Sequence, residues 1–234
     1  MHLLGQYEGY NILENPTLTA TFASAAFRYG HFAMKDYPAM DECGVIYKFG
    51  RPSDDDNHVM AALGALNPIP DYLTHVGRVI ESGSYGNVAR GMISKVGTPL
   101  NFTTHPAIRN LIGERGRFDV AALDIMRARF NSVPPYVTVR KHYHRSTNTL
   151  ENTIYGLNDC PAHLEHDELT DDPIECFLHI TSNVDNAQRL KDLYGKLTNV
   201  DAIVGLMLED YDNTTSIGPT ARNIIIDQFK KLRD

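Results

Sequence analysis

The chain has 234 residues, of which 42% are hydrophobic and 22% charged, and a formal net charge of −7. This length can bury one good-sized core or two small ones. The acidic balance argues against a nucleic-acid-binding surface, which needs a basic stripe to neutralise phosphates. Because no apolar run approaches the length of a membrane-spanning helix, a transmembrane segment is not expected either.

The first strong helical signal covers residues 16–34. Asn15 precedes Pro16 in the arrangement of an N-cap followed by a proline in the first helical turn, and apolar residues then recur at three- and four-residue steps. Residues 35–70 are rich in proline, glycine and aspartate, which predicts a loop-rich excursion. Weaker helical patterns follow at residues 71–82 and 85–96.

A second strong helix is predicted to begin after Asp119, which can cap it, and to end before Pro134 and Pro135. A polar stretch that contains several histidines then occupies residues 141–172. The remaining helices are predicted at residues 186–194, 200–209 and 219–232. Strand-type alternation is nearly absent and no domain boundary stands out. We therefore expect one mainly α domain over residues 1–234.

The three cysteines, Cys43, Cys160 and Cys176, include no CxxC pair, which argues against a structural zinc site. Two interpretations stay open. Cys160 and Cys176 form a disulfide bond, or all three are separate thiols. Glycosylation sequons begin at Asn101 and Asn213, but such tripeptides often arise by chance and support an extracellular setting only weakly.

Two residues on the first predicted helix are candidates for chemistry. Arg28 and His31 are three residues apart, so a helix would place them as neighbours on one face. The simplest interpretation of His31 is a core histidine bonded to a carbonyl group. The alternative is an iron ligand, with Arg28 one turn earlier meeting an anionic group such as a haem propionate.

Asp124 lies on the second predicted helix, on the face that also carries Arg127. A carboxylate there should be partly buried, and burial without a partner is costly. One available partner is Arg127, three residues on, in a plain salt bridge. The other is a histidine from elsewhere in the fold, because a metal-ligating imidazole commonly donates its second N–H to a carboxylate. Such a carboxylate would make the ligand more electron-rich.

Other histidines are weaker candidates. The pairs His142/His144 and His163/His166 lack the HExxH pattern of a metalloprotease, and we expect each to be a solvated surface pair. The sequence also has no glycine-rich phosphate loop after a predicted strand and no GxSxG elbow. A nucleotide site and a serine hydrolase therefore have no support.

Four sequence blocks follow one another over nearly the whole chain. They are Asn15-Pro16 with Phe22 and Ala26-Phe27-Arg28-Tyr29-Gly30-His31; Asp119-Val120-Ala121-Ala122-Leu123-Asp124-Ile125 with Arg127, Arg129 and Pro135-Tyr136; Tyr194-Gly195 with Asn199-Val200-Asp201 and Gly205; and Gly218-Pro219 with residues 228–234. In this order the blocks resemble the animal haem peroxidases, the superfamily of myeloperoxidase and peroxidasin. None of the four would be specific alone.

The resemblance implies a mainly α, haem-peroxidase-like fold enclosing a haem that is non-covalently or covalently attached. His31 would be the proximal iron ligand, Arg28 would pair with a haem propionate, and Arg127 matches a position near the propionates. Asp124 stands where many members carry an asparagine that bonds the proximal histidine. A carboxylate in that place is expected to lower the reduction potential of the iron relative to an asparagine.

The chain departs from the family pattern in two further places. Residues 129–132 are Arg-Phe-Asn-Ser, where members often have Arg-Asp-His-Gly. In the family, the distal histidine and arginine, the calcium-binding loop and the acidic residues that esterify haem lie upstream of the proximal helix, and nothing before Asn15 can supply them. We therefore expect a partial domain without distal catalytic residues, whose haem pocket an upstream domain or a second chain completes. Calcium would belong to that other part.

The leading functional hypothesis is a haem-dependent peroxidase that reduces hydrogen peroxide while oxidising a small donor or a halide. The resemblance implies an extracellular protein, and the isolated chain is expected to be weak or inactive. A fatty-acid dioxygenase of the same superfamily is disfavoured, because those enzymes carry a tyrosine where this chain has Arg28. The third hypothesis is a non-catalytic adhesion or scaffold module that retains the fold.

Overall fold

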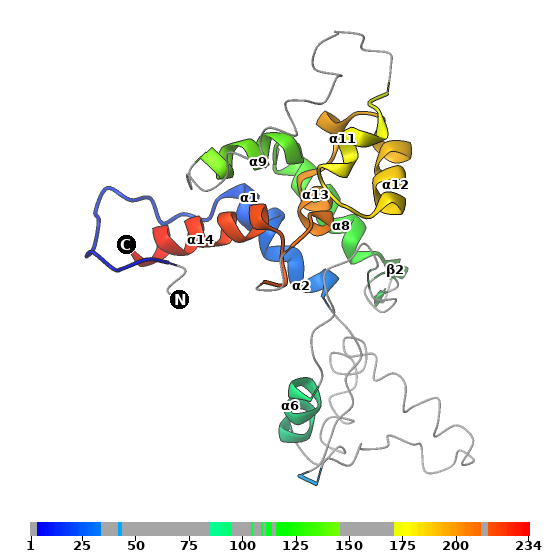
Figure 1. Cartoon of the computed structure of the whole chain (residues 1–234). Helices are drawn as coiled ribbons and strands as arrows, with labels where there is room; N and C mark the ends of the chain where they lie inside the picture. The colour runs from blue at the N-terminus through cyan, green and yellow to red at the C-terminus, as the bar shows by residue number, and fades with distance from the viewer. Residues whose placement is uncertain are drawn as a thin grey trace, which may run out of the picture. The chain divides into compact units, whose positions relative to one another are not determined.

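The structure, a computed structural model, describes residues 4–33, 42–43, 85–94, 104, 109, 111–113, 116–145, 171–211 and 215–234. The chain divides into two compact units, which are described separately. The described residues are mostly helical, which confirms the mainly α class (Figure 1). Among these residues, no helix combines the length and the apolar character needed to cross a membrane.

The larger unit comprises residues 1–32, 99–102 and 122–234. Its helices are α1 (Ala20–Ser24), η1 (Ala26–Arg28), α2 (Tyr29–Phe32), α8 (Val120–Phe130, of which the first two residues belong to the other unit), α9 (Tyr136–Arg145), α11 (Ile174–Leu178), α12 (Val184–Tyr194), η4 (Leu197–Asn199), α13 (Ala202–Leu208) and α14 (Pro219–Arg233). The smaller unit contains α6 (Tyr85–Ile93) and an antiparallel hairpin of β1 (Leu111–Gly113) and β2 (Gly116–Phe118).

Helix α13 is the centre of the larger unit. All seven of its residues are buried, as expected for a short helix that is apolar on every side. It packs against α9 and η1. Gly205 allows this approach, because a Cβ atom at that position would collide with the ring of Tyr136 on α9. The third and second sequence blocks therefore meet in the core.

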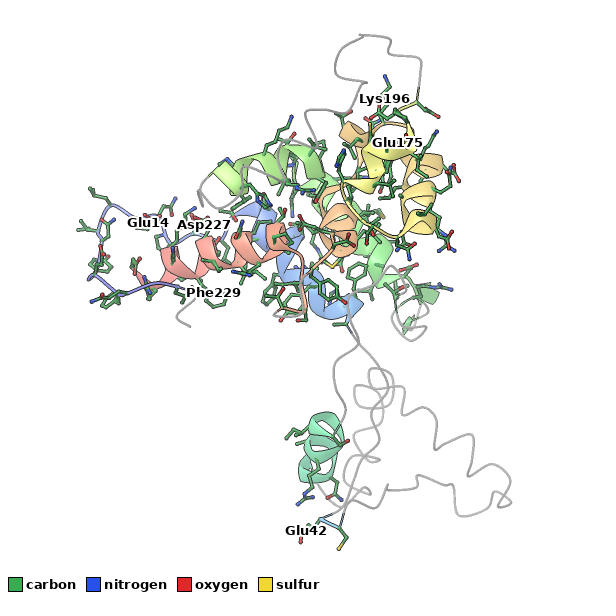
Figure 2. All side chains as sticks on the ribbon, viewed as in Figure 1. Glu14, Glu42, Glu175, Lys196, Asp227 and Phe229 are labelled. Atoms are coloured by element: carbon green, nitrogen blue, oxygen red, sulfur yellow. The ribbon has the colours of Figure 1, made fainter. Side chains whose placement is uncertain are left out.

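The last helix, α14, holds the segment that leads into α1. It packs against α9, α1 and η1. The side chain of Gln228 is fully buried, donates to the carbonyl oxygen of Thr17 (3.2 Å) and accepts from the amide of Thr19 (2.8 Å). Phe229, labelled on α14 in Figure 2, makes an edge-on contact with Phe22 of α1. The two ends of the chain thus fold together.

The first predicted helix is later and more broken than its sequence pattern indicated. It begins at Ala20, because the hydroxyl of Thr19 accepts a hydrogen bond from the Phe22 amide and so caps it. Asn15 instead bonds Thr17 in a local turn. At Ala25 the backbone leaves the helical region (φ −129°, ψ −72°), which separates α1 from η1 and α2.

Helix α9, helix α11 and the β hairpin were not predicted from the sequence. The buried face of α9 includes Arg140 and His144 besides apolar residues, so its periodicity was hidden. The helices predicted at residues 85–96, after Asp119, and at 186–194, 200–209 and 219–232 are present, with ends shifted by a few residues. The helix predicted at residues 71–82 and most of the loop at 35–70 lie outside the described residues.

The cysteines differ in oxidation state. Cys176 is disulfide-bonded, whereas Cys43 carries a thiol. The interpretation as three separate thiols is therefore wrong. Cys160, which the other open interpretation paired with Cys176, lies outside the described residues, as do both sequon asparagines.

The end of α8 contains a serine in the left-handed backbone region. Ser132 has φ +53°. Its amide bonds the carbonyl oxygen of Arg129 (3.0 Å), and the amide of Val133 bonds that of Ala128 (2.9 Å), so the chain leaves α8 in a Schellman-type turn. Glycine is the residue that adopts this conformation without a steric cost. Serine at this position, where family members often have glycine, therefore places strain on the backbone.

We expect Ser132→Gly to raise the free energy of unfolding by about 1 kcal/mol, because it removes the clash of a Cβ atom in a left-handed residue. Ser132→Ala, which keeps the Cβ atom, should give no such gain. Chemical denaturation of the three proteins measures the effect. Equal stabilities for the glycine and alanine variants would contradict the role assigned to the backbone.

Candidate functional site

His31 lies in the four-residue helix α2, and its ring reaches across to α8. Its Nδ1 atom is 2.6 Å from Oδ2 of Asp124, although the two residues are 93 positions apart. The imidazole is partly accessible, with 34% of the side chain exposed, and the carboxylate is completely buried. The hydrogen bond expected between these two residues is therefore present, and a carboxylate rather than a carbonyl group partners the ring.

The second oxygen of the same carboxylate has a different partner. Arg127 donates from a terminal nitrogen to Oδ1 of Asp124 at 2.8 Å, one turn along α8. The two partners that the sequence left as alternatives are thus both used, one on each oxygen. Burial of the Asp124 carboxylate is offset by a cation on one side and an N–H donor on the other.

The hydrogen bond to Asp124 also decides which nitrogen of His31 is available. A carboxylate only accepts, so it assigns the proton of a neutral imidazole to Nδ1. Nε2 then presents its lone pair, and it has no hydrogen-bond partner among the residues that the structure describes. A histidine fixed at Nδ1 by a carboxylate with an open Nε2 is the usual arrangement of a metal-ligating imidazole. The side chains present therefore fit an iron ligand.

A second contact joins the same two segments. Asn131, just after α8, donates from its side-chain amide to the hydroxyl oxygen of Ser24 at the end of α1 (2.8 Å). Ser24 is buried. The segment that carries His31 is therefore tied to α8 at two points. In the sequence, Asn131 stands out only as a departure from the family pattern, and no role is predicted for it.

Arg28 is not part of this arrangement. Its Nε donates to the carbonyl oxygen of Ala23 (3.0 Å), which aligns the guanidinium with the turn between α1 and η1. Its two terminal nitrogens have no partner among the described residues, and it makes no hydrogen bond or ion pair with His31, Asp124 or Arg127. The structure thus brings together His31, Asp124 and Arg127. Arg28 lies apart from them, and its two terminal nitrogens remain available as donors.

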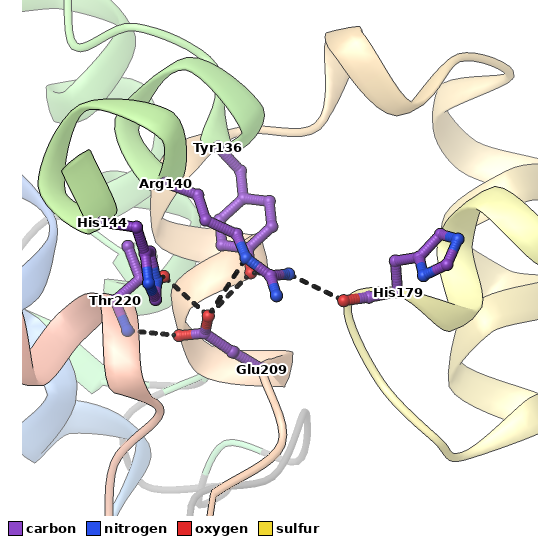
Figure 3. Close-up of polar contacts among 6 residues, drawn as sticks. All are labelled: Tyr136, Arg140, His144, His179, Glu209 and Thr220. Atoms are coloured by element: carbon purple, nitrogen blue, oxygen red, sulfur yellow. Dashed lines mark hydrogen bonds and ion pairs between the residues drawn. The ribbon is translucent and has the colours of Figure 1, made fainter. Parts of the chain in front are cut away.

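A buried polar cluster lies elsewhere in the larger unit, around Glu209 at the end of α13 (Figure 3). Its carboxylate accepts from the hydroxyl of Tyr136 (3.0 Å) and from both the hydroxyl (2.6 Å) and the amide (2.8 Å) of Thr220. Burial raises the pKa of Glu209, and the nearby guanidinium of Arg140 opposes that rise. The cluster holds the first turn of α14 against α13.

Arg140 extends the cluster to a further helix. It donates to the Tyr136 hydroxyl (3.1 Å) and to the carbonyl oxygen of His179 (2.7 Å), which follows α11. The cluster thereby connects α9, α13, α14 and the end of α11 (Figure 3). Every member serves packing between helices, so we assign the cluster a structural role.

The expectation of a solvated His142/His144 pair is wrong for one of its members. His142 is exposed, but His144 is buried, and its Nε2 lies 2.9 Å from the hydroxyl oxygen of Thr220. Burial lowers the pKa of His144 to about 4, with the charge of Arg140 acting in the same direction. The helix period that brings residues 136, 140 and 144 to one face was the signal that could have found it. His163 and His166 lie outside the described residues.

The third sequence block forms a separate polar contact. Arg129 donates from two nitrogens to the two carboxylate oxygens of Asp201 (2.9 and 2.6 Å), and the Tyr194 hydroxyl donates to one of them (2.9 Å). The Asp201 carboxylate raises the pKa of Arg129, and burial together with Asp201 raises the pKa of Tyr194. These residues join α8 to the segment before α13. Among the described residues, no group of three or more His, Cys, Asp or Glu side chains forms a metal site.

Comparison with known proteins decides the family. The sequence profile of the animal haem peroxidases matches residues 1–234, the whole chain. The chain belongs to the animal haem peroxidase family. The fold agrees, because peroxidase A from Dictyostelium discoideum superposes with a TM-score of 0.63 over 98% of this chain and 37% of that protein, at 19% sequence identity.

Similar sequences come from several animals. The chain is 26% identical to human peroxidasin homolog, 28% identical to heme peroxidase 2 of Caenorhabditis elegans and 25% identical to mouse thyroid peroxidase. Each alignment covers 98–100% of this chain. It covers only 14%, 27% and 22% of the respective relatives. The chain therefore corresponds to a limited part of each of these longer proteins.

The buried His144 predicts a pH dependence of stability. Its pKa is about 4 in the folded protein and near 6.5 when unfolded, so the unfolded chain binds the extra proton between these values. Stability should therefore fall as the pH decreases from about 6.5 to about 4, by at most about 1.4 kcal/mol per pH unit for this single proton. Chemical denaturation at a series of pH values measures the slope.

The contribution of His144 is isolated by comparison with His144→Gln. Because the pKa of Glu209 is raised, this residue makes the unfolding free energy fall with rising pH, just above the ordinary pKa of a glutamate. That contribution is opposite in sign to the one from His144, and it is present in both proteins. The difference in unfolding free energy between wild type and variant should thus shrink as the pH falls through the stated window. His142→Gln, at an exposed site, is the matched control. A difference that stays constant with pH would contradict the prediction.

Proposed function

We propose that this chain forms the proximal, haem-ligating side of a haem peroxidase domain, with Nε2 of His31 as the iron ligand. The observation that carries the proposal is the 2.6 Å contact between His31 Nδ1 and the buried carboxylate of Asp124. This contact fixes the ring and directs the Nε2 lone pair away from Asp124. The partly exposed imidazole is accessible to a ligand on that side.

The other predicted residues have defined parts in the proposal. Asp124 holds the ring and increases the basicity of the ligand. Arg28, with two terminal donors left, is the candidate partner of a haem propionate. Arg127 was predicted to lie near the propionates as well, but its observed contact is to Asp124. Bound haem would exchange electrons with hydrogen peroxide. The residues of this chain would hold and orient the haem.

The proposed activity of the complete protein is reduction of hydrogen peroxide with oxidation of a small donor or a halide. Such a reaction needs an acid–base group on the face of the haem opposite the proximal ligand. His31, Asp124, Arg28 and Arg127 are all assigned to the proximal side. The proposal therefore includes residues from an upstream domain or a second chain that complete the pocket, together with any calcium. It also includes an extracellular location.

Haem titration tests the ligand assignment. We expect the purified chain to bind haem at one equivalent with a Soret band typical of histidine ligation. His31→Ala should weaken binding by more than about tenfold, because it removes the axial ligand. His142→Ala removes an exposed histidine and should bind as the wild type does. Equal affinity of His31→Ala and the wild type would reject the assignment and favour a non-catalytic adhesion or scaffold role.

Turnover of the isolated chain tests the second part of the proposal. With haem bound, the chain should oxidise a small donor at a rate close to that of free haem, because the proximal residues supply no distal acid–base catalysis. Stopped-flow or steady-state assays with hydrogen peroxide measure the rate. Rates far above those of free haem, and lost in His31→Ala, would show that this chain holds the catalytic residues itself.

A further inference from the structure

We propose that Arg127 acts on the iron site through Asp124, as a positioning residue that orients the carboxylate and weakens its hydrogen bond to His31. This inference rests on the proposed function. It differs from the expectation that Arg127 serves a haem propionate directly. The effect of Arg127 on the ligand should therefore depend on the carboxylate of Asp124.

The geometry divides the carboxylate between two partners. Oδ2 faces Nδ1 of His31 at 2.6 Å, and Oδ1 accepts from the guanidinium of Arg127 at 2.8 Å. Asp124 is completely buried, whereas the side chain of Arg127 is 42% exposed. With each oxygen held, the carboxylate plane cannot rotate without breaking one of two charge-assisted hydrogen bonds. Arg127 thus fixes the orientation of the group that orients the imidazole.

The electrostatic consequence follows from the same contacts. A buried carboxylate bonded to the histidine alone would carry an unbalanced negative charge beside the ring. That charge would draw the Nδ1 proton toward the oxygen and give the imidazole more anionic character. The guanidinium compensates for it and so weakens this pull. The site therefore combines a carboxylate with a cation that limits its effect.

The first experiment uses the haem-free chain. In Arg127→Gln, the Nδ1–H proton of His31 should resonate further downfield than in the wild type, because its hydrogen bond to the uncompensated carboxylate becomes stronger. In the Asp124→Asn background the same substitution should leave the resonance unchanged. Nuclear magnetic resonance of the labelled histidine side chains measures this directly, and no haem is required.

The second experiment measures the reduction potential of the haem-bound chain. Asp124→Asn should raise the potential, because a neutral amide draws the Nδ1 proton less than a carboxylate does. Arg127→Gln should lower it in the wild-type background and change it much less in the Asp124→Asn background. The stretching frequency of the iron–imidazole bond should rise in parallel with each lowering. A loss of packing alone would move neither quantity in this pattern.

A matched control removes a contact between the same two segments without altering charge. Asn131→Ala breaks the bond between Asn131 and Ser24. It should lower the stability of the fold, leaving the His31 resonance and the potential near their wild-type values. Shifts in Asn131→Ala as large as those in Arg127→Gln would mean that loosening of α8 explains the effect, and the proposal would be rejected.

The remaining outcomes separate the two proposals. If Arg127→Gln shifts the potential equally in both backgrounds and leaves the His31 resonance unmoved, Arg127 acts on haem directly and the inference is overturned. If the resonance shifts as described but the wild-type chain binds no haem, the coupling of Arg127 to His31 stands and the proposed function fails. An unmoved resonance together with unmoved potentials would also overturn the inference.

Discussion

The structure around His31 depends on one buried carboxylate. Asp124 is removed from solvent and receives a donor on each oxygen, an imidazole on one side and a guanidinium on the other. Without these partners, burial of the charge would cost several kcal/mol. The carboxylate needs the imidazole as a partner, and it also determines which ring nitrogen of His31 remains available. The same carboxylate atoms therefore determine both the contact between the two helices and the orientation of the imidazole.

Other polar residues in or near the recognised sequence blocks join the helices of the larger unit. Asp201 connects Arg129 on α8 with Tyr194, and Glu209 gathers donors from α9 and α14. Each of these carboxylates accepts from several donors, and for Glu209, which is buried, such partners are required. The sequence blocks thus contain two kinds of residue, those that surround His31 and those that connect one helix to another. Only the structure separates them.

Amphipathic periodicity is a local signal, and it predicted the helical class and most helix positions. The meeting of His31 with Asp124 was expected only from the resemblance to the haem peroxidases, because the residues alone left Arg127 and an unspecified histidine as partners of the carboxylate. It did not reveal α9, whose buried face includes an arginine and a histidine. The polar residues on that face, Arg140 and His144, have partners in Glu209 and Thr220, which lie at distant positions that the sequence did not connect with them. The break at Ala25 and the serine turn after α8 were also hidden, since both depend on tertiary contacts rather than propensity. The simultaneous use of both Asp124 oxygens could not be chosen from sequence.

The anchoring of the first helix by the last has a consequence for biosynthesis. Gln228 bonds Thr19 across 209 positions and Thr17 across 211. The backbone that leads into α1 can therefore dock on α14 only after synthesis has passed Gln228. Contacts of such high sequence separation form late and slowly, because chain entropy opposes them until their partners exist. The hydrogen bond between His31 and Asp124 spans only 93 positions, so it should be able to form earlier in synthesis than the anchoring of α1 by α14.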